Sequence, residues 1–283
     1  MTDDAEAADS GWFSGLNPDD ADAGSDAITA GRADRPADWP ALAVERGFAD
    51  SESAYYERLR EATLAAAREG VREREAADDQ QLIHAVRALE DTRRVANELT
   101  ERVAEWAGTR DVDAAVNREY IETLAERDPE DPVETRQVSL ASRIVALHEE
   151  SEALHSFVEQ AAQSVAPNLA ALAGPELAAR LVAHAGSLDA LAKKPAGTMQ
   201  VLGAEDALFA HLKGGAPSPK HGVIYTHEYV RGTHPENRGS AARALAGKLT
   251  IAARIDHYSD EYRPELEAEL DDRIERIRAR DDE

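Results

Sequence analysis

The chain has 283 residues, with 56 Asp and Glu against 32 Lys and Arg, so its formal net charge is −24 at pH 7. It has no cysteine, which excludes a disulfide framework, an iron–sulfur cluster, a Cys-ligated zinc site and a thiol nucleophile. Aromatic residues make up only 5%, so a core must come mainly from Ala, Leu and Val, which suit close-packed helices better than sheets.

The basic residues are almost all arginine, because only five are lysine. Scarce lysine beside many acids is typical of proteins from salt-accumulating archaea, in which a negative surface keeps the chain hydrated and salt screens its self-repulsion. The acidic composition therefore does not argue against a nucleic-acid partner. The acidic first ten residues and the lack of an 18-residue apolar run favour a cytoplasmic protein with no membrane partner.

Residues 1–38 hold ten acids, two bases and few large apolar residues. Such a segment cannot bury enough surface to offset its ordering entropy, so we predict a largely disordered arm. Trp12 and Phe13 stand out within it. They are either a short docking motif for a partner or a contact with the protein's own surface.

Residues 39–70 change character. The first ten of them are apolar enough to dock on a neighbouring element. Asp50 or Ser51 can cap a helix that continues through Leu59, and we expect Gly70 to interrupt that helix. The segment therefore connects the acidic arm to the long helical patterns that begin near residue 71.

Two long amphipathic patterns predict an antiparallel coiled-coil hairpin over residues 71–166. As helices, residues 71–107 and 133–165 would span roughly 55 Å and 50 Å, and a compact connection at 108–132 joins them. In the second helix the steps alternate between three and four, which is a heptad seam on which a second copy can also pack. The seam residues are Leu82, Val86, Leu89, Ala96, Leu99, Val103 and Trp106, followed by Ile144, Leu147, Ser151, Leu154, Val158, Ala161 and Val165.

Residues 193–262 lack the acidic coat of the rest of the chain. They contain nine Lys and Arg against seven Asp and Glu, together with all five lysines. Two interpretations remain open, a polyanion-binding face or a buried protein interface that needs no hydration layer. The remaining residues, 263–283, predict a terminal amphipathic helix without an assigned function.

No catalytic motif stands out in this region. Its five histidines form no HxH, HxxxH or HExxH pair, so a metal site would require distant convergence. The stretch 214–222 lacks GxxxxGK[ST], and its prolines remove N–H donors that a phosphate loop needs. The histidines concerned are His211, His221, His227, His234 and His257.

Basic residues gather instead around expected helix starts. The small residues at 203–205 begin a predicted helix, where a phosphate or a base can approach free backbone N–H groups closely. A basic loop at 220–222 precedes an apolar run, and Arg238 opens another helix that carries Arg243 on one face. An ordinary buried helix with solvated arginines is the alternative for that last segment.

Several short motifs occur in order within a window of about 70 residues. They are MQVLGAE at 199–205, ALF at 207–209, KHGVI at 220–224, RG at 238–239, ARALA at 242–246 with KL at 248–249, and IAARID at 251–256. Together they make residues 195–262 resemble the Nop domain of box C/D ribonucleoprotein scaffold proteins. The resemblance extends more loosely through the coiled coil and covers most of residues 40–262.

The resemblance implies a non-catalytic, all-α scaffold in which a long antiparallel coiled-coil hairpin precedes a compact Nop domain at 167–262. In this family the Nop domain binds a kink-turn guide RNA together with a ribosomal-type kink-turn protein. The coiled coil pairs two copies of the scaffold. An N-terminal domain holds fibrillarin, the methyltransferase that modifies a ribose 2′-hydroxyl of rRNA or tRNA, so the scaffold itself is expected to need no cofactor and no metal.

The resemblance also implies the site. Arg238, Arg243 and Lys248 are candidate phosphate contacts, and the ALF motif is similar to the family motif near the guide–substrate duplex. The expected RNA or RNA–protein contacts are Gly203, Ala204, Glu205, Leu208, Phe209, Lys213, Lys220, His221, Arg238, Arg243 and Lys248.

The chain departs from the family pattern at positions that often carry a base there, now Asp206, Ala210 and Ser240. We therefore expect RNA affinity to rely more on the partner protein and on shape. Only about residues 39–50 resemble the end of the family's N-terminal domain, and Trp12 with Phe13 can replace part of the fibrillarin-docking surface. Two alternatives remain, a Nop-type module for another kink-turn particle and a helical metal-dependent hydrolase that uses the histidine-rich loop.

Overall fold

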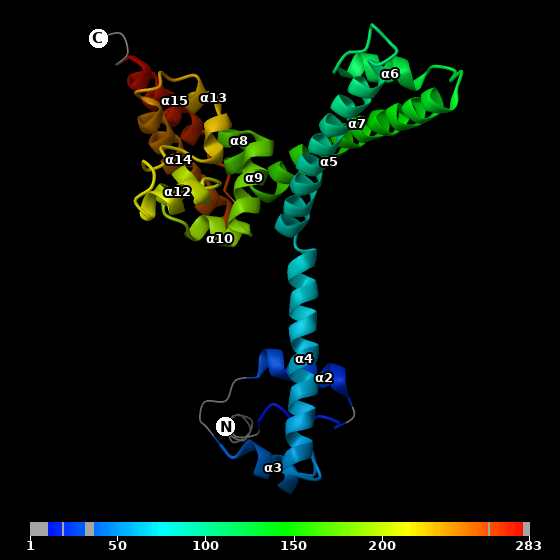
Figure 1. Cartoon of the computed structure of the whole chain (residues 1–283). Coiled ribbons are helices and arrows are strands. Elements are labelled where there is room, and N and C mark those ends of the chain that lie inside the picture. Colours follow the sequence, from blue (N-terminus) through cyan, green and yellow to red (C-terminus); the bar gives the residue numbers. More distant parts are fainter. Residues whose placement is uncertain (1–10, 19, 32–36, 260, 280–283) are drawn as a thin grey trace. The chain divides into compact units, whose positions relative to one another are not determined.

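The computed structural model describes residues 11–18, 20–31, 37–259 and 261–279. Within these residues every regular element is a helix, which confirms the all-α prediction (Figure 1). The chain divides into two compact units, residues 1–77 and 78–283. Residues 1–10, 19 and 32–36 of the predicted arm lie outside the described residues. In the described part of the chain, no helix combines the length and apolar content that crossing a membrane requires.

The N-terminal unit is built on a cluster of aromatic side chains. It contains α2 (Ala21–Ala30), α3 (Trp39–Glu45) and α4 (Glu52–Ala76). Phe13 is only 2% exposed and stacks on Phe48, with 5.3 Å between ring centroids, while Tyr55 of α4 meets it edge-on. The predicted disorder therefore does not hold for residues 11–18 and 20–31. Trp12 and Phe13 contact the protein's own surface and supply the apolar area that this acidic segment otherwise lacks.

The first helical segment is longer than predicted. The hydroxyl of Ser51 accepts a hydrogen bond from the Ala54 N–H at 3.2 Å, so Ser51 caps α4 as expected. Gly70 does not interrupt α4, since a glycine in an exposed helix costs only about 1 kcal/mol. The chain leaves the helical conformation at Ala77, where ψ is 144°. The hairpin consequently begins at Asp78 and not at residue 71.

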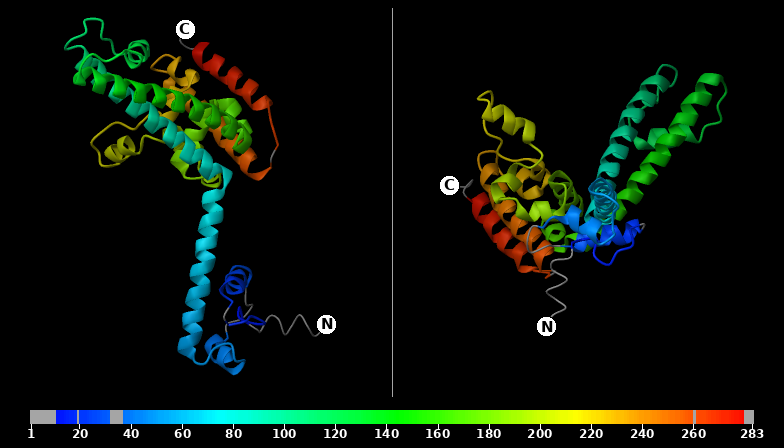
Figure 2. Two further views of the ribbon diagram at one scale, coloured as in Figure 1. Left: turned by 90° about the vertical axis from the view of Figure 1, so that its right-hand side faces the viewer. Right: turned by 90° about the horizontal axis from the view of Figure 1, so that it is seen from below.

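The hairpin consists of α5 (Asp78–Ala107) and α7 (Pro132–Val165), which run antiparallel and side by side (Figures 1 and 2). Between them, α6 (Arg118–Ala125) packs on α7 and closes the far end of the core. Trp106 is 38% exposed, and its neighbour Ala107 takes the core position that the seam assigned to the tryptophan. The buried residues at this end are Val103, Ala107, Tyr120, Ile121, Leu124, Ala141 and Ile144.

A compact helical domain comes after the hairpin, and its centre is the long helix α14 (Arg238–Tyr258). The base of the hairpin shares its core, because Leu82, Val86 and Val158 join the same buried cluster as Leu245 and Leu249. The other elements are α8 (Pro167–Ala173), α9 (Pro175–Ala185), α10 (Leu188–Lys193), α11 (Ala196–Val201), α12 (Glu205–Leu212), the 3-10 helix η1 (Val223–Thr226), α13 (Glu228–Arg231) and α15 (Glu265–Arg278).

The predicted terminal tail belongs to this domain. The apolar face of α15 is buried against the domain core, so the domain continues to Arg278 instead of ending at residue 262. Four side chains at helical spacing form this face, namely Leu266, Leu270, Ile274 and Ile277.

A buried carboxylate fixes α14 to the start of α8. Asp256 accepts hydrogen bonds from the backbone N–H of Asn168 at 2.9 Å, from its side-chain amide at 2.7 Å and from the Leu169 N–H at 2.9 Å. Asp256 therefore caps a helix that lies far away in sequence and has no cap of its own. Burial raises the pKa of Asp256 even though the three donors oppose that effect.

Candidate nucleic-acid interface

Two segments that lie 20 residues apart are held together beside α14. The Gly222 N–H donates to the Gln200 carbonyl at 2.9 Å, and the Val223 N–H donates to the Leu202 carbonyl at 2.7 Å. The side-chain amide of Gln200 donates to the carbonyl of Lys220 at 2.7 Å. These bonds fix the backbone of the basic loop, so the position of Lys220 is set by the end of α11.

Only glycine fits at position 222. A Cβ built there would lie 2.0 Å from the carbonyl oxygen of Leu202 and 2.6 Å from the carbonyl carbon of Val201. Both are backbone atoms, which cannot move aside without breaking the pairing. The KHG motif thus has a structural reason, since its glycine allows the loop to approach the end of α11.

A cavity of about 630 Å³ opens between this loop, α11 and the first turns of α14. It brings together three of the expected site residues, Leu208 of α12, Lys220 of the loop and Arg243 of α14. The backbone of Gly239 leaves room for the aliphatic part of Lys220, whose Cδ would be 3.9 Å from a Cβ at that position. Its remaining lining is mostly small or polar and includes the acidic Glu236.

The side chains of His221 and Arg238 both contact the ring of Tyr225, which was not among the predicted contacts. The imidazole of His221 stacks on the phenol ring at 4.5 Å between centroids, and the guanidinium of Arg238 lies 5.6 Å from the centroid of that ring. Arg238 also donates to the carbonyl of Thr233 at 3.0 Å, which fixes its direction. Burial, with smaller effects of the charges on Arg238 and Lys220, lowers the pKa of His221. In the sequence, the feature that could have identified Tyr225 is its place as the aromatic residue in the apolar run after the basic loop.

This pKa shift predicts a pH effect on folding. The unfolded chain takes up a proton at His221 near the ordinary pKa of 6.5, whereas the folded chain resists it until lower pH. Folding stability therefore falls as the pH drops through 6.5 towards the folded pKa. We expect His221→Asn to lose this part of the pH dependence, measured as the free energy of unfolding in denaturant at pH 7.5 and at pH 5.5. A variant whose stability falls as steeply as that of the wild type would contradict this interpretation.

Other expected contacts lie elsewhere. Lys248 pairs with Glu269 of α15, so its ammonium is directed to the tail helix and not to the cavity. Lys213 is exposed at the end of α12. Just before α12, the carboxylate of Glu205 accepts the Gly203 N–H at 2.8 Å, so this N–H is not free for a phosphate.

The helix that carries the ALF motif is exposed. In both views of Figure 2, α12 (yellow) projects from the domain on its flanking loops, and none of its residues is buried. Phe209 is 61% exposed and Leu212 is 71% exposed. Ala204 and Phe209 therefore remain predicted contacts that do not line the cavity, whereas Leu208 does.

The histidines proposed as candidate metal ligands do not come together at one site. His211 lies 2.9 Å from the Ala216 carbonyl, His227 lies 3.1 Å from the Leu172 carbonyl, and His257 pairs with Asp189 at 2.9 Å. Across the described ranges, no group of three or more His, Asp or Glu is placed to hold a metal ion. The hydrolase alternative therefore has no metal site within this part of the chain.

Comparison with known proteins points to a single family. The family model Nop, described as "snoRNA binding domain, fibrillarin", matches residues 73–278. An uncharacterized NOP5 family protein of Methanocaldococcus jannaschii is 49% identical over 141 residues, which are 50% of this chain and 34% of that protein. Nucleolar protein 56 of Schizosaccharomyces pombe is 46% identical over 123 residues, 44% of this chain and 25% of that protein. The matches thus span only about a third and a quarter of these relatives.

A solved structure extends the likeness over most of the chain. The crystal structure of a fibrillarin/Nop5p complex matches with a TM-score of 0.53 and 25% sequence identity. The match covers 95% of this chain and 99% of the other. The likeness therefore includes most of the N-terminal unit, of which the family model matches only residues 73–77.

Proposed function

This chain belongs to the Nop family of snoRNA-binding proteins, and on that premise we propose that it is the non-catalytic scaffold of a box C/D ribonucleoprotein. It binds a kink-turn guide RNA together with a kink-turn protein in the cytoplasm. It positions a fibrillarin methyltransferase for guided ribose 2′-O-methylation of rRNA or tRNA. The same fold on another kink-turn particle remains the second candidate, and the choice of RNA in the test separates the two.

The observation that carries this proposal is the cavity beside α14. Lys220 and Arg243 reach it from two different segments, and the Arg238 guanidinium lies on the neighbouring Tyr225. This is the one long stretch of the chain in which bases outnumber acids, since residues 193–262 hold nine bases and seven acids. Phosphate groups bind such clustered cations with a strong dependence on salt.

The partner proteins are supported by different parts of the molecule. The solved structure that matches 95% of the chain is a complex of a Nop5 protein with fibrillarin, which supports fibrillarin as a partner. The hairpin exposes Trp106 and Phe157, which supports its use as a surface for a second copy. The kink-turn protein is inferred from the family resemblance of residues 195–262 alone.

The test is assembly with defined components. The full chain, a box C/D RNA, a kink-turn protein and fibrillarin are combined, and RNA affinity and methyl transfer are measured. We expect Lys220→Ala and Arg243→Ala each to weaken RNA binding about tenfold, because each removes a phosphate contact. Each should also lower the slope of log affinity against log salt by about one. Methyl transfer at limiting RNA should fall in proportion.

Lys193→Ala provides the matched control, because it removes the same charge from the same domain at an exposed position outside the cavity. It should leave both affinity and salt slope close to those of the wild type. Equal losses in the control and in the two cavity variants would show a general charge effect and would contradict the proposed site. Binding of an unrelated kink-turn RNA with higher affinity would favour the second candidate.

A further inference from the structure

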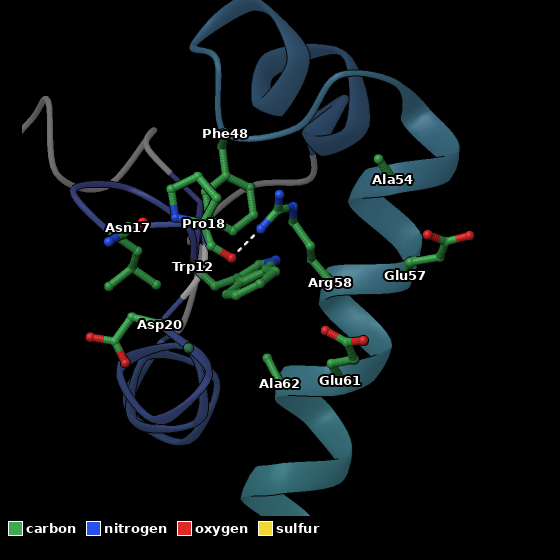
Figure 3. A pocket seen from close by; sticks show the side chains of 12 residues that line it. Trp12, Asn17, Pro18, Asp20, Phe48, Ala54, Glu57, Arg58, Glu61 and Ala62 are labelled. Carbon is green, nitrogen blue, oxygen red and sulfur yellow. Dashed lines mark hydrogen bonds between the residues drawn. The ribbon is translucent and has the colours of Figure 1, made fainter.

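We propose that the cavity of the N-terminal unit receives an arginine or lysine side chain from a protein partner. The cavity has a volume of about 400 Å³ and lies between Trp12, residues 16–18, Asp20, Phe48 and the first turns of α4 (Figure 3). The inference rests on the proposed function in one respect, namely that a scaffold presents this unit to another protein. No RNA contact is involved.

The aromatic wall of the cavity is held in place. The Trp12 and Phe48 rings meet edge-to-face with 5.3 Å between centroids, and the indole N–H of Trp12 donates to the Tyr55 hydroxyl at 3.3 Å. Phe13 packs behind them, almost fully buried. An indole face fixed in this way attracts a cation that comes within about 6 Å of it.

Two acidic residues of α4, one turn apart, line the same cavity. Glu61 directs its carboxylate toward the indole, whereas the carboxylate of Glu57 points away from it (Figure 3). In the described part of the chain, neither side chain has a hydrogen bond or an ion pair. The Glu61 carboxylate beside the indole therefore has no cation among the described residues to pair with, and the nearby charge of Glu57 adds to its attraction for a cation from outside. Asp20 differs, because its carboxylate already caps α2 through the Ala23 N–H at 3.0 Å.

The cavity already holds one cation of its own, which shows the chemistry that it accepts. Arg58 donates to the Pro18 carbonyl, and its guanidinium lies 5.7 Å from the centroid of the Phe48 ring (Figure 3). Arg58 is thus engaged on the Pro18 side of the cavity. A second cation between Trp12 and Glu61 would repeat the same arrangement of charge over an aromatic ring.

The charge of the unit selects the class of partner. Residues 1–77 contain 18 acids and eight bases, so phosphate groups are repelled and basic protein segments are attracted. A volume of about 400 Å³ is also sufficient for an arginine side chain with part of its backbone. The occupant is therefore a basic residue of a protein chain and not a nucleic acid.

The experiment uses the full-length chain labelled with ¹⁵N. The peptide acetyl-Gly-Arg-Gly-amide is titrated while the indole N–H resonance of Trp12 is followed, and the same peptide with citrulline provides an uncharged probe of nearly the same shape. We expect a saturable shift with the arginine peptide and about fivefold weaker binding of the citrulline peptide. The double variant Glu57→Gln/Glu61→Gln should weaken binding of the arginine peptide about fivefold.

The double variant Glu69→Gln/Glu73→Gln is the matched control, because it makes the same charge change at the same spacing on α4 outside the cavity. It should bind the arginine peptide like the wild type. Equal binding of the two peptides, no effect of the cavity variant, or an equal effect of the control variant would each overturn the inference. A Trp12 shift with box C/D RNA and none with the peptide would overturn it as well.

This outcome is separable from that of the proposed function. The Glu57→Gln/Glu61→Gln variant should bind box C/D RNA with unchanged affinity, since the cavity lies in a different unit from Lys220 and Arg243. If the wild-type chain failed to bind the arginine peptide but still bound RNA, only the proposed cation site would be contradicted. Loss of RNA binding by the wild type in the assembly test would instead contradict the scaffold function.

Discussion

Gly222→Ala should destabilise the helical domain by at least about 4 kcal/mol and abolish RNA binding. The added Cβ meets the Leu202 carbonyl oxygen at 2.0 Å, so the loop must leave the end of α11. That movement breaks the hydrogen bonds from the Gly222 and Val223 N–H groups and uncovers Ile224, which is fully buried. Thermal unfolding followed by circular dichroism, at one fixed salt concentration, measures the loss.

Gly239→Ala is the control for this change. At position 239 a Cβ meets only the flexible Lys220 side chain, at 3.9 Å, and the residue already lies in the first turn of α14. Alanine in a helix is favoured over glycine by up to about 1 kcal/mol, so this variant should unfold at the wild-type temperature or slightly above it. Similar unfolding temperatures for both variants would show that the close approach at Gly222 does not limit stability.

Asp256→Ala should cost the domain about 3 kcal/mol, the second largest effect that we expect. It leaves the first two N–H groups of α8 buried without an acceptor, and each such group costs about 1–3 kcal/mol. The Asn168 amide keeps its bond to the Glu261 carbonyl, which limits the loss. The melting temperature should fall by roughly 6–12 °C, and the amides of α8 should lose protection from hydrogen exchange before those of α14.

Asp272→Ala makes the same substitution on the exposed face of α15, and it should change the melting temperature little. A comparable loss in both variants would indicate that reduced negative charge, and not the lost cap, lowers stability. Asp256→Asn provides an intermediate case. Its amide oxygen can still accept one hydrogen bond, but its NH2 group cannot accept from the second backbone N–H, so its stability should lie between those of wild type and Asp256→Ala.

In the hairpin, the spacing of apolar residues predicted some core positions correctly and others not. Apolar residues three or four positions apart predicted that Leu82, Val86 and Leu89 lie in the core, and all three are buried. The same pattern placed Trp106 inside, but Ala107 occupies the core there because α6 closes that end. The predicted break at Gly70 was also wrong, since an exposed glycine weakens a helix without ending it.

The candidate site depends on the motifs for its segments and on the fold for its contacts. The KHG motif lies in the loop that carries Lys220, and the RG motif forms the start of α14 with Arg238. They carried no information on Tyr225, on which His221 and Arg238 meet. They also could not show that Glu269 of α15 takes the charge of Lys248, because that pairing joins positions on two separate helices.

The sequence by itself determined the helical composition, the two long seams and the order of the family motifs, because each of these is a local pattern of side chains along the chain. Only the tertiary structure decided that Trp12 and Phe13 form a core with α4, that the tail completes the helical domain, and which cations line one cavity. These outcomes depend on contacts between segments far apart in the chain, where packing and pairing compete for the same side chains. A charge count over residues 193–262 gives every lysine and arginine the same weight. In the structure, however, Lys248 pairs with Glu269, whereas Lys220 and Arg243 line the cavity.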